Sequence, residues 1–121
     1  IESGGTYVSA APKLALEIAN ERYHPSSWNV YAFHCTDGDN WGEDNLKAQK
    51  AFRELSDICQ MVGYFEILLG TSKGEWNEDV DKTLWGHLLK MKHDNFKMNI
   101  LKGVSDIWPT FTKLFGGLPD V

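Results

Sequence analysis

Seven segments that alternate between helical and strand-like hydrophobic patterns constrain the fold of this chain more than any other feature. Apolar residues recur every three or four positions in the helical segments, and the strand-like segments are short apolar runs. Helices and strands alternating in this way form a parallel sheet through right-handed crossovers. We therefore predict a three-layer α/β fold with helices on both faces of the sheet. The predicted segments are helix 7–23, strand 28–35, helix 44–61, strand 64–69, helix 80–93, strand 96–100 and helix 105–115.

The three predicted strands should be parallel and should lie side by side in chain order, because a helix links each to the next. Residues 28–35 lack strict alternation of polar and apolar side chains, which predicts a strand buried on both faces. Gly63 is expected to end the preceding helix in a left-handed conformation. Residues 96–100 do alternate, as a short edge strand would.

The chain has the size of one domain, with 121 residues of which 42% are hydrophobic. We expect residues 1–121 to form a single domain. An α/β fold usually opens on a strand, whereas this chain opens on Gly4-Gly5 and enters a helix. We therefore expect an N-terminal strand to be missing from the sheet.

Charge and apolar pattern exclude two classes of partner. The formal charge of −5 and the absence of a block of basic residues argue against nucleic-acid binding. No apolar run is long enough to span a bilayer, so we expect no membrane association and a cytoplasmic location. Cys35 and Cys59 lie in apolar stretches without a metal-binding spacing, which predicts free core thiols. Core packing is likewise expected for three of the four residues Trp41, Trp76, Trp85 and Trp108.

The densest polar cluster, Thr36-Asp37-Gly38-Asp39-Asn40, directly follows the first predicted strand. Ligands of open α/β sheets bind at this carboxyl edge, and the oxygen atoms of Asp37 and Asp39 suit a divalent cation such as magnesium. An acidic turn that caps the next helix explains the same residues equally well. A calcium-binding loop is excluded, because Trp41 and Ala48 occupy two of its ligand positions.

Gly4-Gly5-Thr6 is a second candidate, because two glycines permit a sharp turn and Thr6 precedes a helix. Thr6 could be a plain helix cap, or the turn could hold an anion on exposed N–H groups. The interest of Thr6 lies in its pairing with Asp37, since both can reach the same edge of the sheet.

Several motifs resemble one bacterial protein family. The Gly-Gly-Thr turn, Trp28-Asn29-Val30-Tyr31, Asp37-Gly38-Asp39-Asn40-Trp41 and Asp106-Ile107-Trp108-Pro109 are similar to the YeaH/YhbH family of stress- or sporulation-associated proteins of unknown biochemistry. Thr36 stands where that family more often has Ser. The resemblance covers nearly the whole chain.

That family in turn resembles von Willebrand factor A domains, which bind one magnesium ion in a metal-ion-dependent adhesion site. The resemblance implies that this chain is the C-terminal half of such a domain, that Thr6 matches the threonine of the site, and that Asp37 matches its distant aspartate. The Asp-x-Ser-x-Ser loop of the site does not occur in this sequence. We therefore expect an incomplete site in which Thr6, Asp37 and Asp39 take part. Magnesium would bind the intact protein and bind this chain poorly or not at all.

The resemblance implies a protein-interaction domain, because the open metal position of such sites takes an acidic side chain from a partner protein. A role in bacterial stress or sporulation signalling, in a serine protein kinase pathway, is implied in the same way. The alternative is a magnesium-dependent hydrolase or transferase of phosphate esters that uses Asp37 and Asp39. We also expect the chain to form homo-oligomers through strand 28–35, which would have lost its neighbour.

Overall fold

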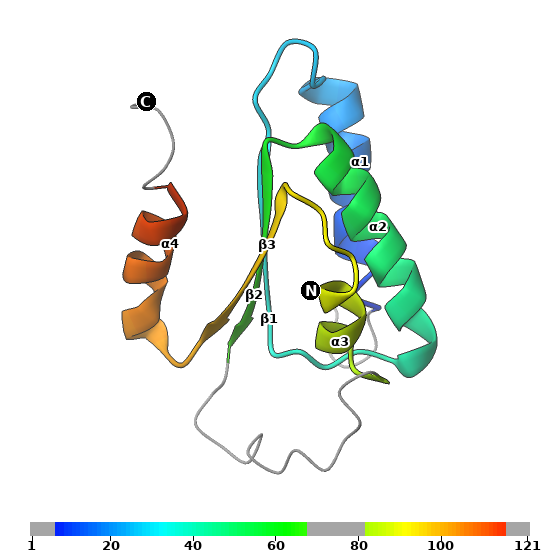
Figure 1. Cartoon of the computed structure of the whole chain (residues 1–121). Coiled ribbons are helices and arrows are strands. Elements are labelled where there is room, and N and C mark those ends of the chain that lie inside the picture. Colours follow the sequence, from blue (N-terminus) through cyan, green and yellow to red (C-terminus); the bar gives the residue numbers. More distant parts are fainter. Residues whose placement is uncertain (1–6, 68–81, 116–121) are drawn as a thin grey trace.

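The computed structural model describes residues 7–67 and 82–115, and Figure 1 shows its α/β architecture. Helices and strands alternate along the chain as the hydrophobic pattern predicts. The elements are α1 (Ala10–Arg22), β1 (Tyr31–Thr36), the 3₁₀ turn η1 (Gly42–Asp44), α2 (Asn45–Ile58), β2 (Met61–Ile67), α3 (Leu84–Leu89), β3 (Phe96–Leu101), the 3₁₀ turn η3 (Val104–Asp106) and α4 (Ile107–Phe115).

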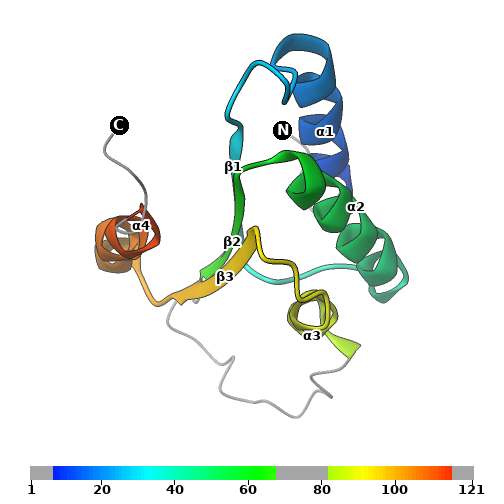
Figure 2. The ribbon, with the colours of Figure 1, turned by 45° about the horizontal axis from the view of Figure 1, so that its top comes forward.

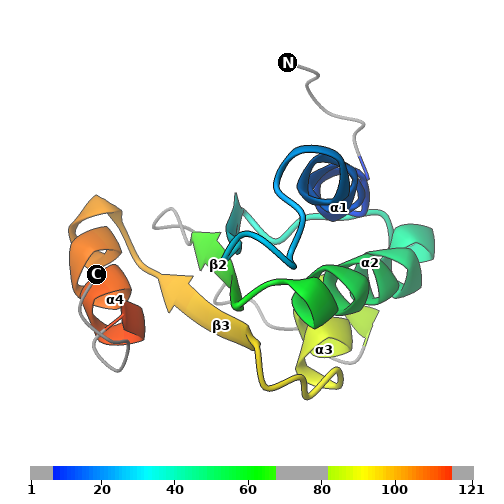
Figure 3. The same cartoon turned by 90° about the horizontal axis from the view of Figure 1, so that it is seen from above.

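The three strands form one parallel sheet in the order β1-β2-β3, which confirms the predicted order and direction. The register places Phe33 beside Gly63 and Gly63 beside Lys97. Helices α1, α2 and α3 line up on one face of the sheet, and α4 lies on the other (Figures 1 and 3). The fold is therefore a three-layer α/β arrangement with helices on both faces.

The core lies between the sheet and the layer of α1, α2 and α3. Strand β2 is buried over nearly its whole length because it is the central strand and is covered on both faces. Each large apolar side chain that is fully buried contributes about 1.5–3 kcal/mol to folding. The buried residues of this core are Ala48, Phe52, Leu55, Cys59, Val62, Tyr64, Leu84, Leu88, Met91 and Phe96.

On the opposite face, α4 packs through a small aromatic cluster. Phe111 lies with its ring centroid 5.1 Å from that of Phe33 and 5.4 Å from that of Phe65. Among the described helices, α4 covers this face of the sheet, whereas α1, α2 and α3 cover the other (Figure 2).

Strand β1 departs from the prediction that it is buried on both faces. Its side chains alternate between exposed and half-buried, with Tyr31 39% and Phe33 36% exposed. The strand also begins at Tyr31 instead of Trp28, and Trp28 is 55% exposed beside Tyr23. The reason is position, because β1 is the outermost strand of the described sheet on its side.

Gly63 does not end a helix, as the sequence suggested, but lies in the middle of β2. Helix α2 ends at Ile58, and Cys59 already has extended backbone angles. A Cβ atom at Gly63 would lie 2.8 Å from Cδ1 of Phe33, so the glycine makes room for that aromatic ring. The position therefore requires glycine for packing.

Two groups of side chains are less buried than predicted. Both described cysteines are free thiols and Cys59 is buried, but Cys35 is exposed because it belongs to the outer strand. Trp41 and Trp108 are 52% and 77% exposed, so neither packs in the core, whereas Trp85 is half-buried against it. Trp76 lies outside the described residues.

The described part of α3 is shorter than the predicted helix 80–93, of which residues 80–81 are not described. Within residues 7–67 and 82–115, no helix has the length and apolarity needed to cross a membrane.

Candidate ligand site at the carboxyl edge of the sheet

The polar loop after β1 lies at the carboxyl edge of the sheet, where parallel α/β folds bind ligands. Strand β1 ends at Thr36, and the chain then passes through residues 37–41 into η1 and α2. Helices α1 and α2 both begin at this edge (Figure 1). The site is thus bordered by one strand end and two helix N-termini.

Two local hydrogen bonds shape the loop. The backbone N–H of Gly38 donates to Oγ1 of Thr36 at 3.2 Å, and the N–H of Asp39 donates to Oδ1 of Asp37 at 2.9 Å. Asp37 and Asp39 are both exposed. Asp37 therefore forms a turn with its own loop and remains exposed. Among the described residues, no side chain caps η1 or α2 by a hydrogen bond, so the helix-capping role of the alternative sequence interpretation is not seen.

A buried carboxylate from β2 lies directly behind this loop. Glu66 is 7% exposed, and its Oε2 accepts a hydrogen bond of 2.9 Å from the hydroxyl of Tyr64. Gly38 has a φ of +90°, and a Cβ atom there would lie 2.7 Å from Oε1 of Glu66. The loop can approach Glu66 this closely because residue 38 has no side chain.

The Tyr64 hydroxyl is held in its protonated form. Burial raises the pKa of Tyr64 far above its ordinary value, and the charge of Glu66, the hydrogen bond to Glu66 and the charge of Asp37 raise it further. Tyr64 therefore acts as a hydrogen-bond donor to Glu66. Sequence reasoning did not include Glu66 in the site, although it is the one charged residue in the apolar strand β2.

A second network joins the start of α1 to the start of α2. Asp44, which is 2% exposed, accepts hydrogen bonds from the backbone N–H of Ser9 at 2.9 Å and from its hydroxyl at 2.6 Å. The amide of Asn40 donates to Asp44 at 3.1 Å and to Oδ1 of Asn45 at 2.9 Å. Oδ1 of Asn40 in turn accepts the N–H of Val8 at 3.0 Å. Asn40 and Asp44 therefore dock α1 onto the loop.

The structure describes two of the three predicted site residues. Asp37 and Asp39 share one exposed loop, whereas Thr6 lies outside the described residues. Val8, two positions after Thr6, is hydrogen-bonded to the loop through Asn40. In the described parts of the chain, no three His, Cys, Asp or Glu side chains form a group that could hold a metal ion.

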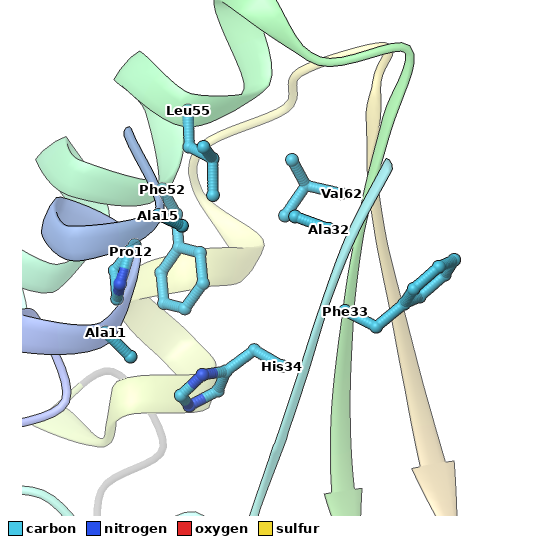
Figure 4. Close-up of a pocket in the computed structure, with 9 residues that line it drawn as sticks. All are labelled: Ala11, Pro12, Ala15, Ala32, Phe33, His34, Phe52, Leu55 and Val62. Carbon is cyan, nitrogen blue, oxygen red and sulfur yellow. The ribbon is translucent and has the colours of Figure 1, made fainter. Parts of the chain in front are cut away.

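A small cavity of about 80 Å³ lies between α1, α2 and the middle of β1, and Val62 of β2 also lines it. His34 points into it among apolar side chains (Figure 4), and the Nε2 atom of His34 is buried without a hydrogen-bond partner. The imidazole stacks on Tyr64 with ring centroids 5.8 Å apart and meets Phe52 edge-on. Burial lowers the pKa of His34, so the neutral ring is favoured.

The parallel sheet, its helical crossovers and its polar carboxyl edge are those of half a Rossmann-like α/β domain. Residues 1–117 match the family model described as "Protein of unknown function (DUF444)", and the chain belongs to this family, which is the YeaH/YhbH family. The resemblance seen in the sequence motifs is thereby confirmed at the level of the family.

Relatives support this assignment along nearly the whole chain. A UPF0229 protein of Ruminiclostridium cellulolyticum is 42% identical over 120 residues, covering 98% of this chain and 29% of the relative. UPF0229 proteins of Clostridium perfringens and Yersinia enterocolitica are 39% and 36% identical over 88% and 94% of this chain, and 26% and 25% of their own lengths. The chain thus spans less than a third of these relatives. No solved structure matches it.

Proposed function

We propose that this chain supplies part of a metal-dependent protein-binding site of the von Willebrand factor A type, with Asp37 as its principal metal ligand. The observation that supports this proposal is the position of Asp37. It is an exposed carboxylate at the end of a parallel strand, on the edge where two helix N-termini meet. Oxygen donors in such a loop suit magnesium.

Thr6 and Asp39 are the other proposed donors. Asp39 is exposed in the same loop as Asp37. Thr6 precedes Val8 by two positions in the sequence, and the N–H of Val8 donates to Asn40 of that loop. The hydroxyl of Thr6 would join Asp37 in the coordination sphere or bind a metal-bound water.

This set of donors is too small to bind magnesium strongly. Magnesium requires nearly complete octahedral coordination, whereas the chain offers Thr6, Asp37 and Asp39. We propose that the other ligands come from elsewhere in the longer family proteins. An acidic side chain of a partner protein would complete the coordination, and a serine protein kinase pathway of bacterial stress or sporulation signalling in the cytoplasm is the proposed setting.

Magnesium titration calorimetry tests this proposal with two proteins. One is the isolated chain, and the other is a chimera in which the chain replaces the matching 120 residues of the Ruminiclostridium relative. The chimera should bind magnesium, whereas the isolated chain should bind it poorly or not at all. Asp37→Ala should abolish magnesium binding by the chimera, because it removes the principal ligand, whereas loss of an outer-shell partner alone typically costs about 10-fold to 100-fold.

Asp94→Ala is the matched control, because Asp94 is exposed and precedes β3, at the opposite edge of the sheet. It should leave magnesium binding unchanged. A dissociation constant in the low micromolar range for the isolated chain would contradict the proposal, and so would a chimera that is insensitive to Asp37→Ala.

The alternative function is magnesium-dependent hydrolysis or transfer of phosphate esters, with Asp37 as metal ligand and Asp39 as base. It is favoured by one observation, which is that both carboxylates lie exposed in the same loop. A phosphatase assay of the chimera with magnesium separates the two functions. If the protein is a binding module, the chimera shows no turnover. If it is an enzyme, the chimera turns over phosphate esters and the Asp39→Asn variant of the chimera does not.

A further inference from the structure

The outer side of β1 carries features of an interface. Among the described strands, β1 is paired with β2 alone and lies at the end of the sheet. Parallel sheets are usually buried, yet Tyr31 and Phe33 remain more than a third exposed, and the Cys35 thiol is exposed. On the opposite face of the sheet, α1 also exposes apolar side chains, since Leu14 is 57% and Ile18 37% exposed.

The arrangement of the helices indicates what covers this surface. Right-handed crossovers on one face of a sheet always advance the strands in the same direction. Helices α2 and α3 lie on one face and carry the chain from β1 to β2 and from β2 to β3. Helix α1 lies on that same face (Figure 3). A parallel strand that feeds α1 must therefore lie beyond β1, on the side away from β2.

The relatives provide the polypeptide for such a strand. The chain matches 29%, 26% and 25% of the lengths of three relatives, so more than two thirds of each lies outside the match. We propose that in full-length family proteins the outer edge of β1 is continued by at least one further parallel strand, from polypeptide that precedes α1. The rest of that polypeptide covers Leu14 and Ile18. This inference does not depend on the proposed metal site.

The backbone groups of β1 that face away from β2 can be blocked selectively, which tests for the added strand. The N–H of Gln60, just before β2, donates to the carbonyl of Val30 at 2.8 Å, so the backbone of Val30 faces β2. Backbone groups alternate sides along a strand. The amide of Cys35 should therefore face away from β2, and Cys35→Pro should block an added strand while sparing the pairing with β2.

Hydrogen exchange of β1 should be compared between the isolated chain and the chimera, with the chain diluted until sedimentation shows a monomer. The β1 amides should exchange at least about 100-fold more slowly in the chimera. Cys35→Pro should abolish that extra protection in the chimera. In the isolated chain it should leave exchange of the β2 amides within about threefold of the parent.

Cys35→Ala is the matched control, because it removes the thiol and keeps the amide, and the extra protection should persist. Equal exchange of β1 in chimera and monomeric chain would overturn the proposal. A chimera that gains its β1 protection only on dimerisation would also overturn it, because the added strand would then belong to a second copy.

Discussion

At the scale of single residues, Gly38 fixes the shape of the candidate site. Its positive φ is strained for other residues, and a Cβ would meet the carboxylate of Glu66, which is buried and held by Tyr64. Gly38→Ala should therefore lower the free energy of unfolding by about 1–3 kcal/mol. Urea denaturation followed by tryptophan fluorescence measures this loss.

Gly42→Ala provides the comparison for Gly38→Ala, because a Cβ at Gly42 meets no atom within 4 Å and φ there is not positive. It should change stability by less than about 0.5 kcal/mol. Equal losses from the two variants would show that the close approach to Glu66 does not shape the loop.

His34 should make the fold sensitive to acid. Burial holds its pKa in the folded chain below the ordinary value of 6.5, which the unfolded chain keeps. The stability that results is present above pH 6.5 and is lost as the pH falls through the folded-state pKa. The ring faces apolar side chains of α1 and α2 and stacks on Tyr64, whose hydroxyl donates to Glu66.

His34→Phe tests this acid sensitivity, since phenylalanine keeps a flat ring against Tyr64 and Phe52 and cannot take a proton. Urea denaturation of both proteins between pH 7.5 and 5, a range set by the ordinary histidine pKa, should show a smaller stability loss for the variant. Parallel curves would mean that His34 does not contribute to acid sensitivity.

At the scale of elements, Asp44 joins two helices that are distant in sequence. Its carboxylate accepts both donors of Ser9 and the amide of Asn40 while buried. Asp44→Ala leaves these donors without their acceptor, and should destabilise the fold by about 2–4 kcal/mol. Urea denaturation measures the loss, and exchange of the α1 amides should accelerate.

Ser9→Ala is the graded control for Asp44→Ala. It removes the hydroxyl bond and keeps the backbone N–H bond to Asp44, so it should cost about 1 kcal/mol. If Asp44→Ala cost no more than Ser9→Ala, the carboxylate would not be what docks α1.

The order and direction of the elements could be predicted from sequence. Hydrophobic periodicity is read from each segment by itself, and right-handed crossovers are a rule that nearly all parallel sheets follow. Burial of β1 could not be predicted, because the pattern of Tyr31 and Phe33 does not reveal whether a neighbouring strand is present. Gly63 was misassigned because its role is to make room for Phe33, which lies 30 residues earlier.

Part of the candidate site could likewise be predicted from sequence, and part could not. The loop with Asp37 and Asp39 could be found from sequence, because it is a continuous polar segment after an apolar strand. Glu66 and Asp44 could not, because their roles arise from contacts with Gly38 and Ser9, far away in the chain. Sequence locates the edge of the sheet, whereas tertiary contacts decide which carboxylates hold it together.

At the scale of the whole molecule, the isolated chain should self-associate. The β1 strand exposes Tyr31 and Phe33 at the end of the sheet, α1 exposes Leu14 and Ile18, and exposed apolar surface on a small domain usually binds another protein. A second copy is the available partner when the chain is alone. Two β1 edges can pair antiparallel about a two-fold axis, which closes the assembly as a dimer.

Sedimentation velocity over a range of concentrations measures this association. Cys35→Lys should shift the dimer toward monomer, because a lysine on an edge strand opposes pairing with another edge, and Cys35→Ser should not. The chimera should remain monomeric if its own polypeptide already covers β1. A concentration of several hundred micromolar should exceed the dissociation constant of such a dimer. An isolated chain that is still monomeric there would contradict self-association through β1.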